Sequence, residues 1–138
     1  TALLDAIGRT IHKIGNAQKH TAEDYRAKKV MFVIITDGEE NSSREYSAEK
    51  VKAQIEQQKT KYGWEFIFLG ANIDAVQTAG RFGIAPDRAV DYIADSEGTE
   101  LNFKVMSAVV ATFREAGTVD EACFEEIRKD VKRRGGRE

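Results

Sequence analysis

A second cysteine and a long apolar run are both missing from this sequence. The 138 residues include one cysteine, Cys123, so no disulfide can form within the chain, and a reducing compartment is favoured. The longest apolar run, residues 30–35, is far shorter than the ~18 residues that cross a bilayer. We therefore expect a cytoplasmic protein without a membrane span, although the chain starts at Thr1 and does not show what precedes that residue.

An excess of charge of either sign is missing as well. Lys and Arg number 21 and Asp and Glu number 23, so the charge balance predicts neither nucleic acid nor an anionic membrane as a partner. The basic residues 132–134 and Arg137 are the local exception, and we interpret them as a solvated chain end. With 41% hydrophobic residues, the chain has enough apolar material for the core of one globular domain.

Stretches with helical periodicity alternate with short apolar runs along the chain. Apolar residues at helical spacing predict a helix over residues 2–15. A continuous apolar run then predicts a strand over residues 30–35, buried on both faces. A helix follows Ser47, a second strand covers residues 64–69, and Asp74 caps another short helix.

The C-terminal half continues the same alternation. A third strand over residues 89–93 leads to a helix that starts at Ser96. A last helix over residues 120–133 has a capping box formed by Thr118 and Glu121. Buried strands that alternate with amphipathic helices pair in parallel through right-handed crossovers. The sequence therefore predicts an α/β fold of three layers, Rossmann-like, with a mostly parallel sheet between two layers of helices.

The loop after the first strand is the richest in groups that bind ligands. In an open parallel sheet, ligands bind beyond the carboxyl ends of the strands. Asp37 stands at such an end, and Gly38 behind it allows a sharp turn. A carboxylate in this place suits a hard cation such as Mg²⁺, but an Asp-Gly pair also closes many strands without any ligand.

Two motifs resemble a known metal site when they are taken together. The sequence Thr1-Ala2-Leu3-Leu4-Asp5-Ala6-Ile7 opens the first helix, and Thr36-Asp37-Gly38-Glu39-Glu40-Asn41 ends the first strand. These motifs and their spacing resemble the last two motifs of the metal-ion-dependent adhesion site of von Willebrand factor A domains. Residues 66–74 and 82–101 are similar to bacterial members of the family. The resemblance covers about residues 1–116, and residues 117–138, an additional helix and basic tail, fall outside it.

The resemblance implies a metal site with Thr1 and Asp37 as ligands. In the family, an Asp-x-Ser-x-Ser motif after the first strand completes that site, and this motif does not occur in these 138 residues, which correspond to a domain without its N-terminal part. Mg²⁺ prefers about six oxygen ligands, so we expect Mg²⁺ or Mn²⁺ in the complete domain and weak or no binding by this chain. Four further residues are expected at the rim of the site: Gly38, Glu39, Asn41 and Asn72.

The same resemblance implies a protein-binding module without enzymatic activity. An acidic side chain of a protein partner would complete the coordination of the metal ion. Two alternatives stay open: a metal-dependent phosphohydrolase that uses Asp37, and a scaffold with no metal function. The enzyme alternative lacks a second acid with a lysine or threonine at a neighbouring strand tip. Zinc ligand spacing, a nucleophile elbow and phosphate-binding glycine patterns are also absent from the sequence.

The edge of the first predicted strand indicates a second copy of the chain as a further partner. In the resembled family another strand lies directly beside it, and that strand is not among these residues. The edge of residues 30–35 is apolar and free of proline, and such an edge is a template for pairing with another strand. Each buried backbone group left unpaired costs about 1–3 kcal/mol. We therefore expect a homodimer in which two copies pair antiparallel at this edge and form a six-stranded sheet.

Overall fold

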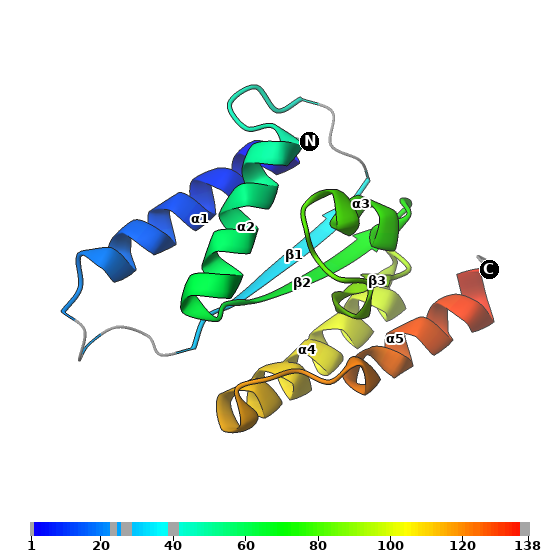
Figure 1. Ribbon diagram of the computed structural model, residues 1–138. Helices are drawn as coiled ribbons and strands as arrows, with labels where there is room; N and C mark the ends of the chain where they lie inside the picture. The colour runs from blue at the N-terminus through cyan, green and yellow to red at the C-terminus, as the bar shows by residue number, and fades with distance from the viewer. Residues whose placement is uncertain (1, 23–24, 26–28, 39–41, 136–138) are drawn as a thin grey trace.

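The computed structural model of the chain describes residues 2–22, 25, 29–38 and 42–135. Helices and strands alternate along most of it (Figure 1). Their bounds, in chain order, are α1 Leu3–Lys19, β1 Met31–Asp37, α2 Ala48–Tyr62, β2 Glu65–Ala71, α3 Ala75–Arg81, the 3₁₀ turn η2 Pro86–Arg88, β3 Ala89–Asp91, α4 Ser96–Ala116, the 3₁₀ turn η3 Glu121–Phe124, α5 Glu125–Asp130 and a wider closing helical turn η4 Val131–Gly135.

The described strands form one sheet in the order β1-β2-β3, and both pairs are parallel. Met31 pairs with Glu65 and Asp37 with Ala71, so β1 and β2 end at the same level. Helices cover both faces of the sheet, with α1, α2 and α3 on one side and α4 and α5 on the other (Figure 1). This arrangement confirms the predicted α/β fold with a parallel sheet between helical layers.

Alternate residues of the strands feed two separate hydrophobic cores. In β2, Phe66 and Phe68 face α1, α2 and α3, whereas Ile67 and Leu69 face α4 and α5. Phe124, next to the start of α5, is fully buried in the second core. The segment beyond residue 116 is therefore packed into the same body as the strands.

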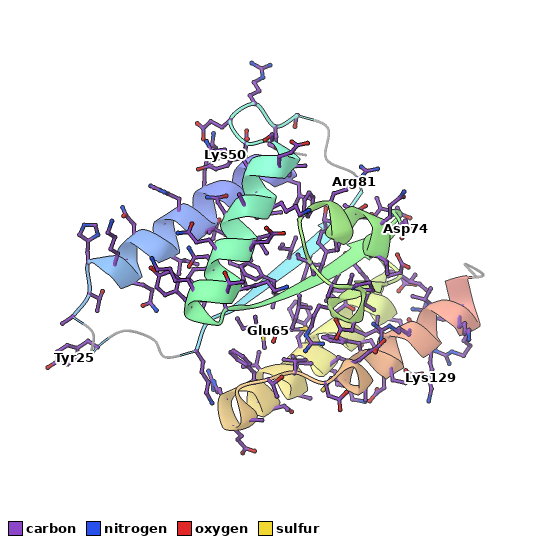
Figure 2. All side chains as sticks on the ribbon, in the orientation of Figure 1. Tyr25, Lys50, Glu65, Asp74, Arg81 and Lys129 are labelled. Carbon is purple, nitrogen blue, oxygen red and sulfur yellow. The ribbon has the colours of Figure 1, made fainter. Side chains whose placement is uncertain are left out.

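Arg88, in the turn η2 before β3, connects the start of β2 with the segment that follows α4. Arg88 Nε lies 2.7 Å from Glu65 Oε1, and both side chains are largely buried. Arg88 also donates to the carbonyl of Val119. Glu65 is labelled in Figure 2, between the sheet and α4. These contacts fix the amino end of the sheet to the C-terminal segment.

The prediction that β1 is buried on both faces is wrong for one face. Phe32, Ile34 and Thr36 are buried, but Ile35 on the other face is 51% exposed. The reason is geometric, because α4 packs over β2 and β3 and reaches only part of β1, where Val33 is half-buried. β2 is the strand that is buried on both faces, with Phe66 through Ala71 all inside.

The start of α4 agrees with the prediction, but the start of the last helical segment does not. The helix α4 is capped by Asp95, whose side chain accepts a hydrogen bond from the Gly98 amide at 2.8 Å, and Ser96 is the first helical residue. The last segment is not one helix with a capping box of Thr118 and Glu121. Asp120 caps a 3₁₀ turn there, which then passes into α5. A carboxylate caps each of these segments, and at the second of them Asp120 replaces the expected capping box.

Lys132 and Arg133 in the basic tail are exposed, as expected for a solvated end, but Arg134 is not free in solvent. Its guanidinium lies 2.7 Å from carboxylate oxygens of both Asp95 and Asp130 and 2.6 Å from Glu97. Asp130 is itself 5% exposed. The tail is therefore bound to the beginning of α4 through Arg134. Arg137 lies outside the described residues.

Candidate functional site

The carboxyl end of β1 carries the candidate metal ligand Asp37. It is the last residue of the strand, and its side chain is exposed. The next residue, Gly38, has a φ of 114°, which side-chain-bearing residues rarely adopt, and its amide donates to the Ala71 carbonyl at 3.0 Å. The hydroxyl of Thr36 donates to the Gly38 carbonyl at 3.3 Å. The chain thus turns sharply away and leaves the Asp37 carboxylate at the tip of the sheet.

Asn72, expected at the rim, lies in direct contact with Asp37. Register places Ala71 opposite Asp37, so Asn72 follows at the same edge of the sheet. Its backbone φ is 59°, in the left-handed region that asparagine tolerates better than most residues. The side-chain amide donates a hydrogen bond to Asp37 Oδ1. The loops after β1 and β2 are therefore joined by one carboxylate–amide bond, and Asp37 keeps a second oxygen for another ligand.

The end of β3 closes this side of the site. The Asp91 carboxylate accepts the Ala75 amide at 3.0 Å, at the start of α3. Burial raises the pKa of the neighbouring Tyr92 phenol, and the negative charge of Asp37 raises it further. Asp74 caps α3 as predicted, with its carboxylate 3.0 Å from the Gln77 amide (Figure 2).

Asp5 is a buried carboxylate whose structural role was not predicted from the sequence. Its two oxygens accept the backbone amides of Arg44, Glu45 and Tyr46 at 2.8–2.9 Å, and its own amide donates to Ser43 Oγ. These amides, Arg44 first, hold the pKa of Asp5 below its ordinary value, although burial opposes them. The bonds fasten the segment that leads from the Asp37 turn to the first turns of α1.

The start of α1 therefore lies at the same end of the sheet as Asp37 (Figure 1). Close packing at Gly8 supports this arrangement, because a Cβ atom there would lie 2.2 Å from the Tyr46 ring. Only glycine allows Tyr46 to contact the helix in this way. Asp5 is recognisable in the sequence as an acid in the first turn of a helix, a signal that does not reveal its three distant partners.

Three of the predicted site residues, Thr1, Glu39 and Asn41, lie outside the described residues. The other three, Asp37, Gly38 and Asn72, are brought together at one edge of the sheet. Over the described ranges, no group of three or more His, Cys, Asp or Glu side chains is placed to hold a metal ion. Of the predicted site residues that the structure describes, Asp37 and Asn72 are the two with oxygen-bearing side chains.

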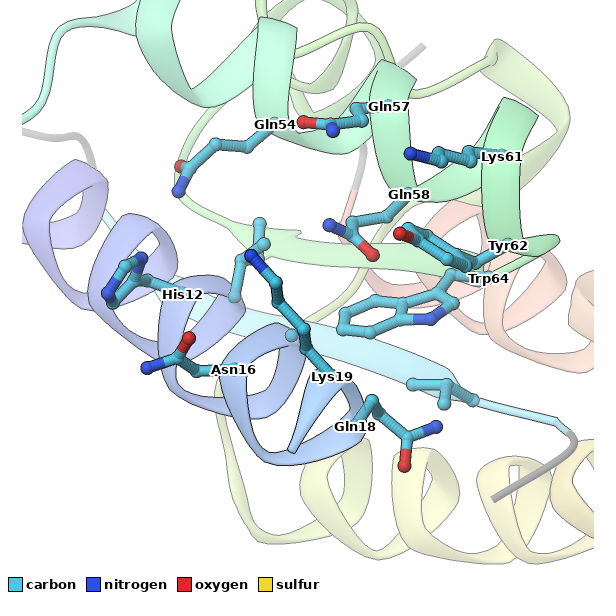
Figure 3. A pocket seen from close by; sticks show the side chains of 13 residues that line it. His12, Asn16, Gln18, Lys19, Gln54, Gln57, Gln58, Lys61, Tyr62 and Trp64 are labelled. Atoms are coloured by element: carbon cyan, nitrogen blue, oxygen red, sulfur yellow. The ribbon is translucent and has the colours of Figure 1, made fainter. Parts of the chain in front are cut away.

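A polar cavity of about 610 Å³ opens at the other end of the sheet, between α1 and α2 (Figure 3). Trp64, just before β2, forms its floor, and Lys19 and Lys61 approach from the two helices. Among the described residues, its lining side chains include several amides and no carboxylate. The cavity is separate from Asp37, because Trp64 and Asp37 lie beyond opposite ends of the parallel strands.

A second cavity, of about 260 Å³, is an apolar groove between β1 and α4. We call it the β1–α4 groove. It is lined by Val33, Ile35, Tyr92, Thr99, Asn102, Phe103, Met106 and Val110. Phe103 is 68% exposed there, whereas Asn102 is 4% exposed and its Oδ1 has no hydrogen-bond partner within the described ranges.

The described residues form an α/β protein that carries the polar side chains of Asp37 and Asn72 at the carboxyl ends of a parallel sheet. Comparison with protein-family models, curated proteins and solved structures found no significant match to the chain. Of the helices that the structure describes, none has both the length and the apolar composition needed to cross a membrane.

Proposed function

We propose that this chain belongs to a protein-binding module of the von Willebrand factor A type, in which a metal ion at Asp37 binds an acidic side chain of a partner. The site is incomplete in these residues, because the Asp-x-Ser-x-Ser motif is absent from the sequence. Mg²⁺ or Mn²⁺ is the ion that suits the oxygen ligands.

The placement of Asp37 is the observation that carries this proposal. A carboxylate at the tip of a parallel strand, held through one oxygen by Asn72, leaves the other oxygen free for a cation. The Asp5 bonds bring the first turns of α1, which carry the second resembled motif, to the same end of the sheet. The first turns of α1 and the end of β1, far apart in the sequence, therefore lie at the same end of the sheet.

Phosphoryl transfer is the enzymatic alternative, and it has less support. Such a site uses a second acid and a cationic or hydroxyl side chain around the first carboxylate. Asp91, at the end of β3 on the far side of β2, accepts a hydrogen bond from the Ala75 amide. A binding role needs only the ion and an open coordination position, so it requires fewer functional side chains than phosphoryl transfer does.

Titration with Mn²⁺ tests the proposal. We expect a dissociation constant no tighter than millimolar for this chain, because two side chains offer too few oxygens to offset dehydration of the ion. Paramagnetic broadening in NMR spectra should centre on the amides of Gly38 and Asn72. Asp37→Ala should abolish that broadening, and fusion to a segment that carries the serine motif should tighten binding.

Asp74→Asn is the matched control for Asp37→Ala. Asparagine caps a helix as well as aspartate does, so this variant removes a carboxylate from the same end of the sheet and keeps the fold. Broadening that persists in Asp37→Ala, or that vanishes in Asp74→Asn, would place the ion elsewhere. Low-micromolar affinity would mean that other ligands complete the site.

A further inference from the structure

We propose that the cavity between α1 and α2 binds a small polyol that carries one anionic group, either a sugar phosphate or a sugar acid. The volume of this cavity, about 610 Å³, is that of a site for one small molecule (Figure 3). Its walls are α1 and α2 and its floor is Trp64, at the opposite end of the strands from Asp37. The cavity is therefore separate from the proposed metal site.

The charge that lines the cavity is positive. Lys61, in the last turn of α2, and Lys19, in the last turn of α1, both line it (Figure 3). The Lys61 ammonium lies 5.5 Å from the centre of the Tyr62 ring and has no carboxylate partner among the described residues. The described lining contains no carboxylate either. The cavity therefore favours an anion over a cation.

Side-chain amides supply the hydrogen-bonding groups of the walls. Asn16, Gln57 and Gln58 carry amides with both donor and acceptor atoms. Gln54 donates from Nε2 to the Gly8 carbonyl at 3.2 Å, whereas its buried Oε1 receives no hydrogen bond from the described residues. A hydroxyl group both donates and accepts, so the hydroxyls of a polyol match these amides. One of them would supply the donor that Gln54 lacks, once its amide turns toward the cavity.

Gly15 keeps one wall of the cavity open. Glycine inside a helix is less favourable than alanine, so its presence in α1 needs a reason. Packing explains Gly8, where a Cβ atom would collide with the Tyr46 ring. At Gly15, a Cβ atom would approach only the Gln58 amide nitrogen among the described atoms outside its own helix, at 3.7 Å. Glycine at this position therefore leaves space between the helices, on the lining of the cavity.

The floor of the cavity suits the apolar face of a sugar ring. Trp64 and Ile11 are buried beneath the amides, and ligand sites combine such apolar surfaces with a few polar groups that orient the ligand. Lysine in the last turn of a helix also stabilises that helix through its dipole, so the lysines alone would not identify a site. The helix dipole requires neither an amide-lined cavity nor a glycine beside it.

Fluorescence of Trp64, the only tryptophan of the chain, measures binding directly. We expect a saturable change with glucose 6-phosphate or glucuronate, with a dissociation constant of about 1 mM or tighter. Glucose and inorganic phosphate should each bind about tenfold more weakly or less, because each offers one part of the recognised chemistry. Comparison of the phosphate ester with the carboxylate identifies the anionic group.

Lys61→Gln tests the charge. It should weaken the binding of the charged sugar about tenfold and leave the affinity for glucose unchanged, because it removes the ammonium and keeps a polar side chain. Lys59→Gln is the matched control. Lys59 lies in the same last turn of α2 but does not line the cavity, so this variant should bind as the unmodified protein does.

Gly15→Leu tests the location. Leucine favours a helix and would fill the space between α1 and α2, so binding should be lost while circular dichroism shows an intact fold. Ala17→Leu places the same side chain on α1 outside the cavity and should leave binding unchanged. No saturable fluorescence change with either charged sugar, or equal affinity for glucose, would overturn the proposal. So would full binding by a folded Gly15→Leu or by Lys61→Gln, and Lys61→Gln alone decides if the leucine variant does not fold.

Discussion

Asn102 is a buried polar residue whose side-chain oxygen receives no hydrogen bond from the described residues. It is 4% exposed, and its Oδ1 has no partner in the described part of the chain. A buried acceptor without a donor costs about 1–3 kcal/mol, so replacing it by an apolar group of similar size should remove that cost. We expect Asn102→Leu to raise the free energy of unfolding by about 1 kcal/mol, measured by urea denaturation.

Asn102→Asp is the isosteric control for this prediction. A carboxylate at the same place would be buried without a donor, and it should lower the urea midpoint clearly. If leucine lowered stability and aspartate had no effect, the side chain would have to be hydrated, and the groove at this point would be wet.

Single residues show where the sequence was informative and where it was not. Asp37 and Asn72 could be placed at one edge from strand order alone, because the carboxyl ends of parallel strands meet there. Asp5 could not, because its partners are backbone amides about forty residues away, which no side-chain pattern marks. Thr1, Glu39 and Asn41 remain predictions.

At the scale of elements, the start of α4 depends on a glycine. A Cβ atom at Gly98 would lie 1.8 Å from the Ile93 carbonyl oxygen, and the Gly98 amide is the donor to the Asp95 cap. Alanine favours helices by about 1 kcal/mol over glycine, but here the clash should outweigh that gain. We expect Gly98→Ala to destabilise the protein by about 2 kcal/mol or more in thermal or urea unfolding.

The exposed Gly80 in α3 offers the opposite case for comparison. Nothing lies within 4 Å of a Cβ atom built there, so Gly80→Ala should stabilise the protein by up to about 1 kcal/mol. Equal effects of the two alanines would show that the turn before α4 adjusts without cost.

Helices and strands were predicted well where apolar residues recur at regular spacing, and less well at their ends. The runs in β1 and β2 and the caps Ser47 and Asp74 were found from the sequence. The open face of β1 was not, since an apolar run looks the same whether one face or both are covered. Its exposure depends on how far α4 reaches, which is a property of packing between elements.

At the scale of the whole molecule, acid should loosen the C-terminal segment. Hydrogen bonds from Arg134, with help from Arg133 and against the effect of burial, lower the pKa of Asp130 from 3.8 to about 2. The unfolded chain takes up this proton at a higher pH than the folded one, so the stabilisation is present above about pH 4 and is lost as the pH falls toward 2. With allowance for screening by solvent, it amounts to about 1–2 kcal/mol.

Asp130→Asn isolates this contribution. Between pH 5 and pH 2.5, the free energy of unfolding of the unmodified protein should fall by about 1–2 kcal/mol more than that of the variant. Urea titrations at several pH values measure the difference. Parallel pH profiles would show that the carboxylate is not stabilised in its charged form in the folded protein.

The central position of β2 determines the order in which parts of the molecule can unfold. Both of its edges are paired and both of its faces are buried, so β2 is the only described strand that belongs equally to the two cores. Loss of α5 or of the start of α1 can leave it in place, since each opens one face alone. Opening β2 requires both halves to separate at once, which makes this strand the last part of the protein to exchange its amide hydrogens with solvent.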